Sequence, residues 1–118
     1  MARAEGPPAA PDVSVVVVNF NGGDDLTRCV RSVFDAAGDA RVEAIVVDNA
    51  SHDGSARLAA ERTPQARLIE NPTNQGLSAA WNQGARAVDA PWVLFLNPDT
   101  EIARGDFVAS TKPGYYAR

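Results

Sequence analysis

The chain has 118 residues, of which 45% are hydrophobic and 22% are charged, and its formal net charge at pH 7 is −4. This length suits one domain with its own core, and the composition makes global disorder a poor description. The acidic balance, with a pI near 4.8, argues against a nucleic-acid binder, because such proteins carry a basic patch. A phosphate-bearing ligand would therefore need local donors or a metal ion.

Residues 1–11 are rich in alanine and proline and lack the apolar middle region of a signal peptide, so we expect a mobile tail. No apolar stretch approaches the roughly 20 residues that a membrane-spanning helix needs. The single cysteine, Cys29, cannot form an intrachain disulfide. This fits a reducing compartment, and we expect a cytoplasmic protein in which Cys29 is a small apolar residue on a helix.

The first regular segments follow the tail. The run 13–18 contains four consecutive valines, which predicts a strand buried on both faces of a sheet. Apolar residues then recur at helical spacing from 26 to 34, and this stripe predicts a helix that packs on the sheet.

A second strand and helix repeat the pattern. The run 42–47 predicts another buried strand, and the stretch 51–55 supplies the cap of a helix that runs to about Arg62. Pro64 ends this helix. A shorter strand is expected at 66–70, closed by an Asn-Pro pair.

The third helix has the clearest periodicity. Its apolar and small residues recur at i, i+3, i+4, i+7, i+8 and i+11, namely at Leu77, Ala80, Trp81, Gly84, Ala85 and Val88. We expect Gly84, and Gly76 before the helix, to permit close packing on the sheet. The apolar run 92–96 then predicts a fourth strand.

Strands that alternate with helices imply right-handed crossovers. We therefore predict an α/β fold with a mostly parallel, doubly wound, Rossmann-like sheet. Residues 12–102 would form this domain, whereas the segment 103–118 shows no convincing helix or strand.

Polar side chains follow the first two predicted strands. Asp48 could accept hydrogen bonds from a ribose hydroxyl or a base N–H, or it could simply cap the next turn. Asn19 and Asn21 offer amide groups beside two glycines, where a backbone can approach a ligand, although such a stretch is also an ordinary turn.

The fourth strand stops at an Asn-Pro-Asp-Thr stretch. Asp99 and Asn97 form the best candidate metal pair, because hard divalent cations take oxygen ligands and often use only one or two from protein. The alternative is a type I turn, which every residue of the stretch favours. The two interpretations are compatible, because the turn would aim Asp99.

Four linked stretches carry a resemblance to a known family. They read VSVVVVNFN at 13–21, IVVDNASHDGS at 45–55, NQGLSAAWNQG at 74–84 and LFLNPDT at 94–100. In this order and spacing they resemble the amino-terminal half of family 2 glycosyltransferases, which have a GT-A fold. The Asn-Pro-Asp variant is similar to the rhamnosyltransferase-like branch that builds bacterial cell-surface polysaccharides.

The resemblance implies roles for five residues. Asn19 and Asn21 would line the nucleotide pocket, and Asp48 would bind the base or ribose of a nucleotide-diphosphate sugar. Asn97 and Asp99 occupy the place of the family's Asp-x-Asp motif, so Asp99 would hold a divalent ion, Mg²⁺ or Mn²⁺, on the diphosphate. The acceptor would be a glycan or a lipid-linked molecule, which leaves peripheral association with a membrane open.

The chain departs from the family pattern in two respects. Asn97 replaces the first acidic residue of the motif, which weakens metal affinity. The family's acceptor-binding half and catalytic carboxylate lie well beyond residue 118, so no catalytic residue is assigned. We expect a truncated chain that binds a donor rather than turns it over.

Other classes of protein fit less well. A receiver-type signalling domain clusters an acidic pair after its first strand, where this chain has asparagines. A dinucleotide-binding oxidoreductase would place Gly-x-Gly-x-x-Gly at the first turn, and that motif is missing from this turn. A noncatalytic α/β nucleotide-binding module remains an open alternative.

Overall fold

The computed structural model describes residues 10–103 and 115–117. The predicted tail lies outside these residues except for Ala10 and Pro11. The elements are β1 (Val13–Asn19), α1 (Asp24–Ala36), β2 (Val42–Asp48), α2 (Ser55–Arg62), β3 (Arg67–Glu70), α3 (Leu77–Arg86), β4 (Trp92–Leu96) and β5 (Tyr115–Ala117). Every strand and helix predicted between residues 13 and 96 is present, with boundaries shifted by one or two residues.

The sheet confirms the predicted fold class. Its strand order is β3-β2-β1-β4-β5, and β1 pairs in parallel with both β2 and β4, while β3 pairs in parallel with β2. The expectation of an irregular segment over 103–118 is wrong for residues 115–117, because β5 pairs antiparallel with β4. A three-residue strand carries too little pattern to be found from sequence, and its pairing with β4 is a long-range contact.

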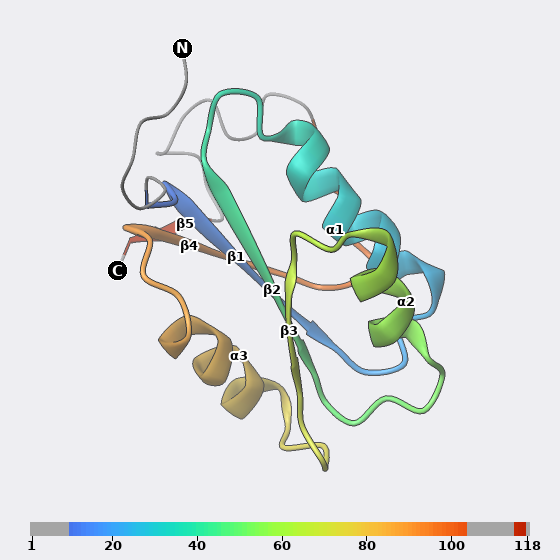
Figure 1. The fold of residues 1–118 in the computed structure, drawn as a ribbon. Coiled ribbons are helices and arrows are strands. Elements are labelled where there is room, and N and C mark those ends of the chain that lie inside the picture. The colour runs from blue at the N-terminus through green and yellow to red at the C-terminus, as the bar shows by residue number, and fades with distance from the viewer. Residues whose placement is uncertain (1–9, 104–114, 118) are drawn as a thin grey trace.

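Helices cover both faces of the sheet, with α1 and α2 on one side and α3 on the other (Figure 1). The alternation of side chains along β1 explains this arrangement, because Val15 and Val17 join the cluster that contains α1, while Val16 and Val18 join the cluster that contains α3. The valine run therefore supplies both halves of the core, as a strand buried on both faces requires.

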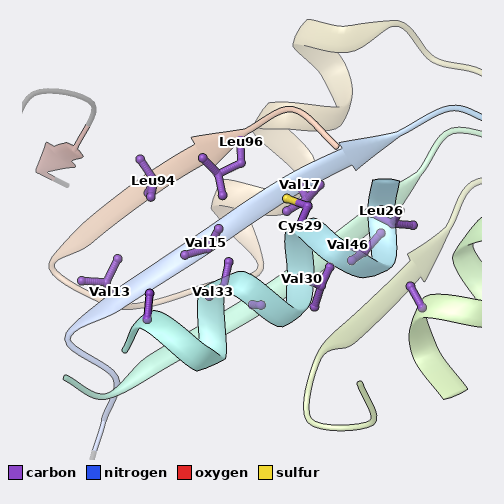
Figure 2. Close-up of a cluster of buried hydrophobic side chains, with 13 residues drawn as sticks. Val13, Val15, Val17, Leu26, Cys29, Val30, Val33, Val46, Leu94 and Leu96 are labelled. Atoms are coloured by element: carbon purple, nitrogen blue, oxygen red, sulfur yellow. The ribbon is translucent and has the colours of Figure 1, made fainter. Parts of the chain in front are cut away.

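The larger half of the core lies under α1. Figure 2 shows Leu26, Cys29, Val30 and Val33 of this helix facing the side chains of β1, β2 and β4. These four residues are fully buried. The prediction that Cys29 is a small apolar residue on a helix is confirmed, and the structure shows in addition that it is buried.

Helix α3 differs from its prediction at two positions. Leu77, expected on the apolar stripe, is the first residue of the helix and is 54% exposed. Gly76 does not serve close packing, since a Cβ there would meet nothing within 4 Å; its φ of +85° is what favours glycine. Gly84 does serve close packing, because a Cβ would overlap Val16 and approach Val47 to 3.2 Å.

Candidate functional site

The carboxyl ends of three neighbouring strands form the candidate site. The register aligns Asn19 of β1 with Asp48 of β2, and Val17 of β1 with Leu96 of β4. The loops after β1, β2 and β4 therefore leave the sheet at the same edge, which is where open α/β sheets bind ligands. All five residues predicted for the site lie at this edge.

Asn19 is the centre of the edge and is fully buried. Its Nδ2 group lies within hydrogen-bond distance of Asp48 Oδ1 at 2.9 Å, of Ser55 Oγ at 2.9 Å and of Ser51 Oγ at 3.2 Å. Its Oδ1 atom accepts a hydrogen bond from the backbone N–H of Gly22 at 3.2 Å. The amide of Asn19 thus holds the two loops on either side of it, and its polar atoms have partners within the chain.

Asp48 is 4% exposed and is also held by its own loop. Ser51 donates to it twice, from Oγ to Oδ1 at 2.6 Å and from the backbone N–H to Oδ2 at 3.1 Å. The expected turn-capping role of Asp48 is therefore real. Because each carboxylate oxygen has two lone pairs, Oδ2 with its one intrachain bond can still accept a hydrogen bond from a ligand.

The loop after β1 is tied to the loop after β2. Asn21 is exposed and has a φ of 52°, a conformation that asparagine tolerates. Its backbone N–H donates to Ser51 Oγ at 2.7 Å, and its Oδ1 accepts from the His52 N–H at 2.8 Å. These bonds tie Asn21 to the loop after β2 through its backbone N–H and its amide oxygen, and leave its Nδ2 group to face solvent or a ligand.

Asp53 strengthens the same connection. Its Oδ1 accepts from the hydroxyl and the backbone N–H of Ser55 at 2.6 and 3.0 Å, and its Oδ2 accepts from the Gly23 N–H at 3.0 Å. The bond from the Ser55 hydroxyl, followed by that from the Ser55 backbone, holds the pKa of Asp53 below its usual value. The cap of α2 lies within residues 51–55 as predicted, but it is Gly54, which makes no side-chain cap hydrogen bond. Asp53 instead holds Ser55, the first residue of the helix.

A second polar group, missed from the sequence, joins β2 to the loop before α3. Asn49 is 3% exposed, and its side chain donates to the carbonyl of Gly76 and accepts from Asn71 Nδ2, both at 3.1 Å. Asn71 and Gln83 exchange two hydrogen bonds of 2.9 and 2.8 Å. The sequence did carry a sign of this group, since Asn49 and Asn71 directly follow β2 and β3, and asparagine side chains commonly bond to nearby backbone groups.

The Asn-Pro-Asp-Thr stretch after β4 forms the expected turn. The backbone N–H and the hydroxyl of Thr100 both donate to the carbonyl of Asn97, at 3.1 and 2.6 Å. The turn is closed by these two bonds, while the side chains of Asn97 and Asp99 are exposed at the edge. The turn therefore presents two oxygen-bearing side chains to a ligand.

Gly22 brings this turn against the loop after β1. A Cβ at Gly22 would overlap Asn19 Oδ1 and would lie 3.1 Å from Pro98 Cβ. The absence of a side chain at this position lets the two loops touch. The group around Asp48 and the group around Asp99 thus meet through Asn19, Gly22 and Pro98.

Phe20 is a further residue that the sequence reasoning did not assign. It directly follows Asn19 and is 50% exposed, which is unusual for a phenylalanine. An exposed aromatic ring at this edge could stack on a base, since every base has a π-face. In the sequence, Phe20 is recognisable as an aromatic residue between two asparagines.

The donor atoms at Asn97 and Asp99 suit a hard divalent cation. Within the residues that the structure describes, no group of three His, Cys, Asp or Glu side chains could hold a metal ion. An exposed carboxylate and amide on one turn match the alternative pattern, in which a few protein oxygens and the phosphates of a ligand complete the coordination of Mg²⁺. The residues therefore fit an ion that arrives with a phosphorylated ligand.

Helix length bears on the relation of this site to membranes. Across residues 10–103 and 115–117, each helix is too short or too polar to cross a bilayer.

Comparisons with known proteins agree on one family. The family model described as glycosyl transferase family 2 matches residues 14–109. The chain is 36% identical over 100 residues to the succinoglycan biosynthesis protein ExoO of Rhizobium meliloti (strain 1021). This match covers 81% of this chain and 28% of that protein. It is 32% identical over 106 residues to N-acetylglucosaminyl-diphospho-decaprenol L-rhamnosyltransferase of Mycobacterium tuberculosis (strain ATCC 25618 / H37Rv), covering 80% of this chain and 34% of that protein.

Solved structures resemble the chain over most of its length. The mannosyltransferase PcManGT from Pyrobaculum calidifontis, in complex with GDP-Man and Mn²⁺, matches with a TM-score of 0.72 and 25% identity over 93% of this chain and 35% of its own. S. aureus TarS 1-349 matches with a TM-score of 0.69 and 23% identity, over 79% of this chain and 29% of its own, and shows a shared fold. The chain thus spans about a third of the length of the relatives it matches.

Proposed function

Because the chain belongs to glycosyl transferase family 2, we propose that it binds the nucleoside diphosphate of a sugar donor at the carboxyl edge of its sheet, with Mg²⁺ or Mn²⁺ at Asp99. The sugar would pass to a glycan or lipid-linked acceptor in the synthesis of cell-surface polysaccharide. The names of two relatives support this, since one is a succinoglycan biosynthesis protein and the other a rhamnosyltransferase with a lipid-linked acceptor.

One observation carries the proposal. Asn19 donates to Asp48 on one side and accepts from Gly22 on the other, and Gly22 lies against Pro98 of the turn that bears Asp99. A nucleoside site and a diphosphate site would therefore be neighbours on a single connected edge. A nucleotide-sugar donor needs this adjacency, because its nucleoside and diphosphate are covalently joined.

The nucleoside would bind on the β1 and β2 side of the edge. Asp48 Oδ2 would accept a hydrogen bond from a ribose hydroxyl or a base N–H, and the exposed ring of Phe20 would stack on the base. Asn21 would donate from its Nδ2 group. Asn19 would act through Asp48 as a positioning residue, because its own amide is buried.

The diphosphate would bind on the β4 side. Asp99 would supply a carboxylate oxygen to the ion, and Asn97 a weaker amide oxygen. A bound divalent ion would neutralise charge that develops on the departing nucleoside diphosphate. The first turn of α1 carries Asp24 and Asp25, so a diphosphate at this edge would meet carboxylates and would need a cation to bind.

The structural neighbour adds support for the metal. The PcManGT structure contains both GDP-Man and Mn²⁺, and its identity to this chain is 25%. We take residues 12–102 as the donor-binding unit. The family match does not favour the alternative of a receiver-type signalling module.

Calorimetric titration tests the proposal. The chain would be titrated with UDP, GDP and dTDP, each in MnCl₂ and in EDTA. We expect at least one nucleotide to bind about tenfold or more tightly with Mn²⁺, the size of one additional charge-assisted contact. The Asp99→Asn variant should lose this enhancement because it removes the charged ligand of the ion.

Asp39→Asn is the matched control. It makes the same change of charge at an exposed position in the connection between α1 and β2, away from the candidate site, and should keep the enhancement. Nucleotide binding that is equal in MnCl₂ and EDTA would favour a noncatalytic nucleotide-binding module. Absence of binding to all three nucleotides would refute the donor site itself.

A further inference from the structure

Helix α1 is attached to the segment that bears Asp99. Cys29 and Ser32 are three residues apart on this helix, so their side chains lie on the same face, one turn from each other. Both contact residues between 97 and 102. In Figure 2 the sulfur of Cys29 lies where α1 meets the sheet, close to Val17.

The contacts attach both ends of the segment. Cys29 Sγ donates to the carbonyl of Asn97 at 3.6 Å and lies 4.0 Å from Thr100 Oγ1. Ser32 Oγ accepts from the backbone N–H of Ile102 at 2.9 Å. The hydroxyl of Ser32 donates in turn to the Cys29 carbonyl at 2.6 Å, which fixes its lone pairs toward Ile102.

The other side of the same turn rests on Gly22. Pro98 is the residue that a Cβ at Gly22 would approach to 3.1 Å, and the backbone of Gly22 is held by Asn19. The turn that carries Asp99 therefore contacts α1 on one side and the loop that precedes α1 on the other. This leaves Asp99 exposed on a backbone whose position is fixed.

We propose that Cys29 and Ser32 are positioning residues, which hold residues 97–102 on α1 and so set the place of the Asp99 carboxylate relative to Asp48. The inference rests on the proposed function, since it gives these residues a part in metal-dependent donor binding. Neither residue touches the donor. Their effect reaches the ligand only through the turn.

A pair of nearly isosteric variants separates positioning from simple stability. Ser32→Thr keeps the hydroxyl that Ile102 needs, whereas Ser32→Val has almost the same shape without it. Thr27→Val is the control on the same helix, because Thr27 Oγ1 is buried without a hydrogen-bond partner in the described structure and has no contact of this kind to lose. Cys29→Val gives a second test of the other attachment.

The main readout is the ratio of nucleotide Kd in EDTA to that in MnCl₂, measured with the 118-residue chain and the nucleotide that binds best. We expect Ser32→Val and Cys29→Val to lower this ratio about threefold to tenfold, the range of one net hydrogen bond, with Kd in EDTA unchanged. Ser32→Thr and Thr27→Val should retain the wild-type ratio. A merely structural role would instead weaken binding equally in both buffers.

Amide hydrogen exchange gives a readout that needs no ligand. Exchange of the Ile102 N–H should be faster in Ser32→Val than in Ser32→Thr, because only the latter keeps the acceptor. If Ser32→Val kept the wild-type Kd ratio and the wild-type exchange rate of the Ile102 N–H, this inference would be overturned. The proposed metal site would stand in that case. A wild type without Mn²⁺ enhancement would overturn the proposed metal site and this inference with it.

Discussion

Ser51 joins the two loops of the nucleoside side through one hydroxyl. It donates to Asp48 and accepts from the Asn21 backbone at 2.7 Å, and Asn19 Nδ2 lies 3.2 Å away. We expect Ser51→Ala to weaken nucleotide binding about threefold to tenfold, because Asp48 loses a hydrogen bond that orients it. Calorimetry in MnCl₂ and in EDTA should show the same loss, since this residue lies on the nucleoside side.

Ser51→Thr is the matched control, because it keeps the hydroxyl, and it should bind within about twofold of wild type. A Ser51→Ala variant that lost binding only in MnCl₂ would place Ser51 on the metal side of the site. That result would contradict the division of the edge into a nucleoside end and a diphosphate end.

Burial makes the thiol of Cys29 a weaker acid than an exposed thiol. Desolvation by burial raises its pKa from 9.0 to about 11. A hydrogen bond with Thr100 lowers the pKa in part, whereas the negative charges of Asp99 and Glu101 raise it further. The unfolded chain therefore loses this proton first, so the free energy of unfolding should fall as pH rises from about 9 to 11. Two pKa units correspond to about 3 kcal/mol.

Chemical denaturation of wild type and Cys29→Ala measures this effect. The difference in unfolding free energy between them should be constant below about pH 8 and should shrink by about 2 kcal/mol by pH 11, where the folded thiol is half ionised. Other groups that titrate in this range cancel in the difference. A difference that does not change with pH would show that the folded thiol ionises normally.

At the scale of elements, α3 depends on Gly84. A methyl group there would overlap Val16 of β1 and press on Val47 of β2, and both valines are buried. We expect Gly84→Ala to lower the free energy of unfolding by about 1 to 3 kcal/mol, because overpacking outweighs the gain in helix propensity. Denaturant unfolding measures the change.

Asn82→Ala is the control for helix propensity. Asn82 is exposed on α3, two residues before Gly84, so alanine should be neutral or stabilising by about 0.5 kcal/mol. If Gly84→Ala were as stable as Asn82→Ala, the close approach of α3 to the sheet would not limit the choice of residue.

The elements themselves were predictable where their pattern is local. The valine run of β1 and the helical spacing in α1 determine type and place, because burial on a sheet demands them. Leu77 shows the limit of the pattern, since periodicity does not reveal that the first residue of α3 is exposed. The pairing of β5 with β4 depends on contacts distant in sequence, which no local pattern records.

The site was predictable in place but not in detail. The sequence placed Asn19 and Asp48 at the ends of the first two strands, and the register of the sheet pairs these two residues. Their hydrogen bonds depend on side-chain direction, so the buried orientation of the Asn19 amide and the part of Ser51 could not be read from spacing. Binding roles for these residues remain predictions.

At the scale of the whole molecule, the two faces of the sheet serve different loops. Helix α1 supports the turn of Asp99, and the loop before α3 on the opposite face is held to the end of β2 through Asn49. A ligand at the carboxyl edge would therefore contact loops that are anchored in both halves of the core. Rigid support of this kind lowers the ordering cost of binding.

The strand order sets the distances between the groups that a ligand could contact along the carboxyl edge. β2 and β4 flank β1, and neighbouring strands lie about 4.8 Å apart, so the strands that lead to Asp48 and Asp99 are separated by about 10 Å. On the proposed function, a donor would lie across the strand ends, with its base over β2 and its diphosphate toward β4. The sugar would then point to the β5 side, and an acceptor would have to approach from that direction.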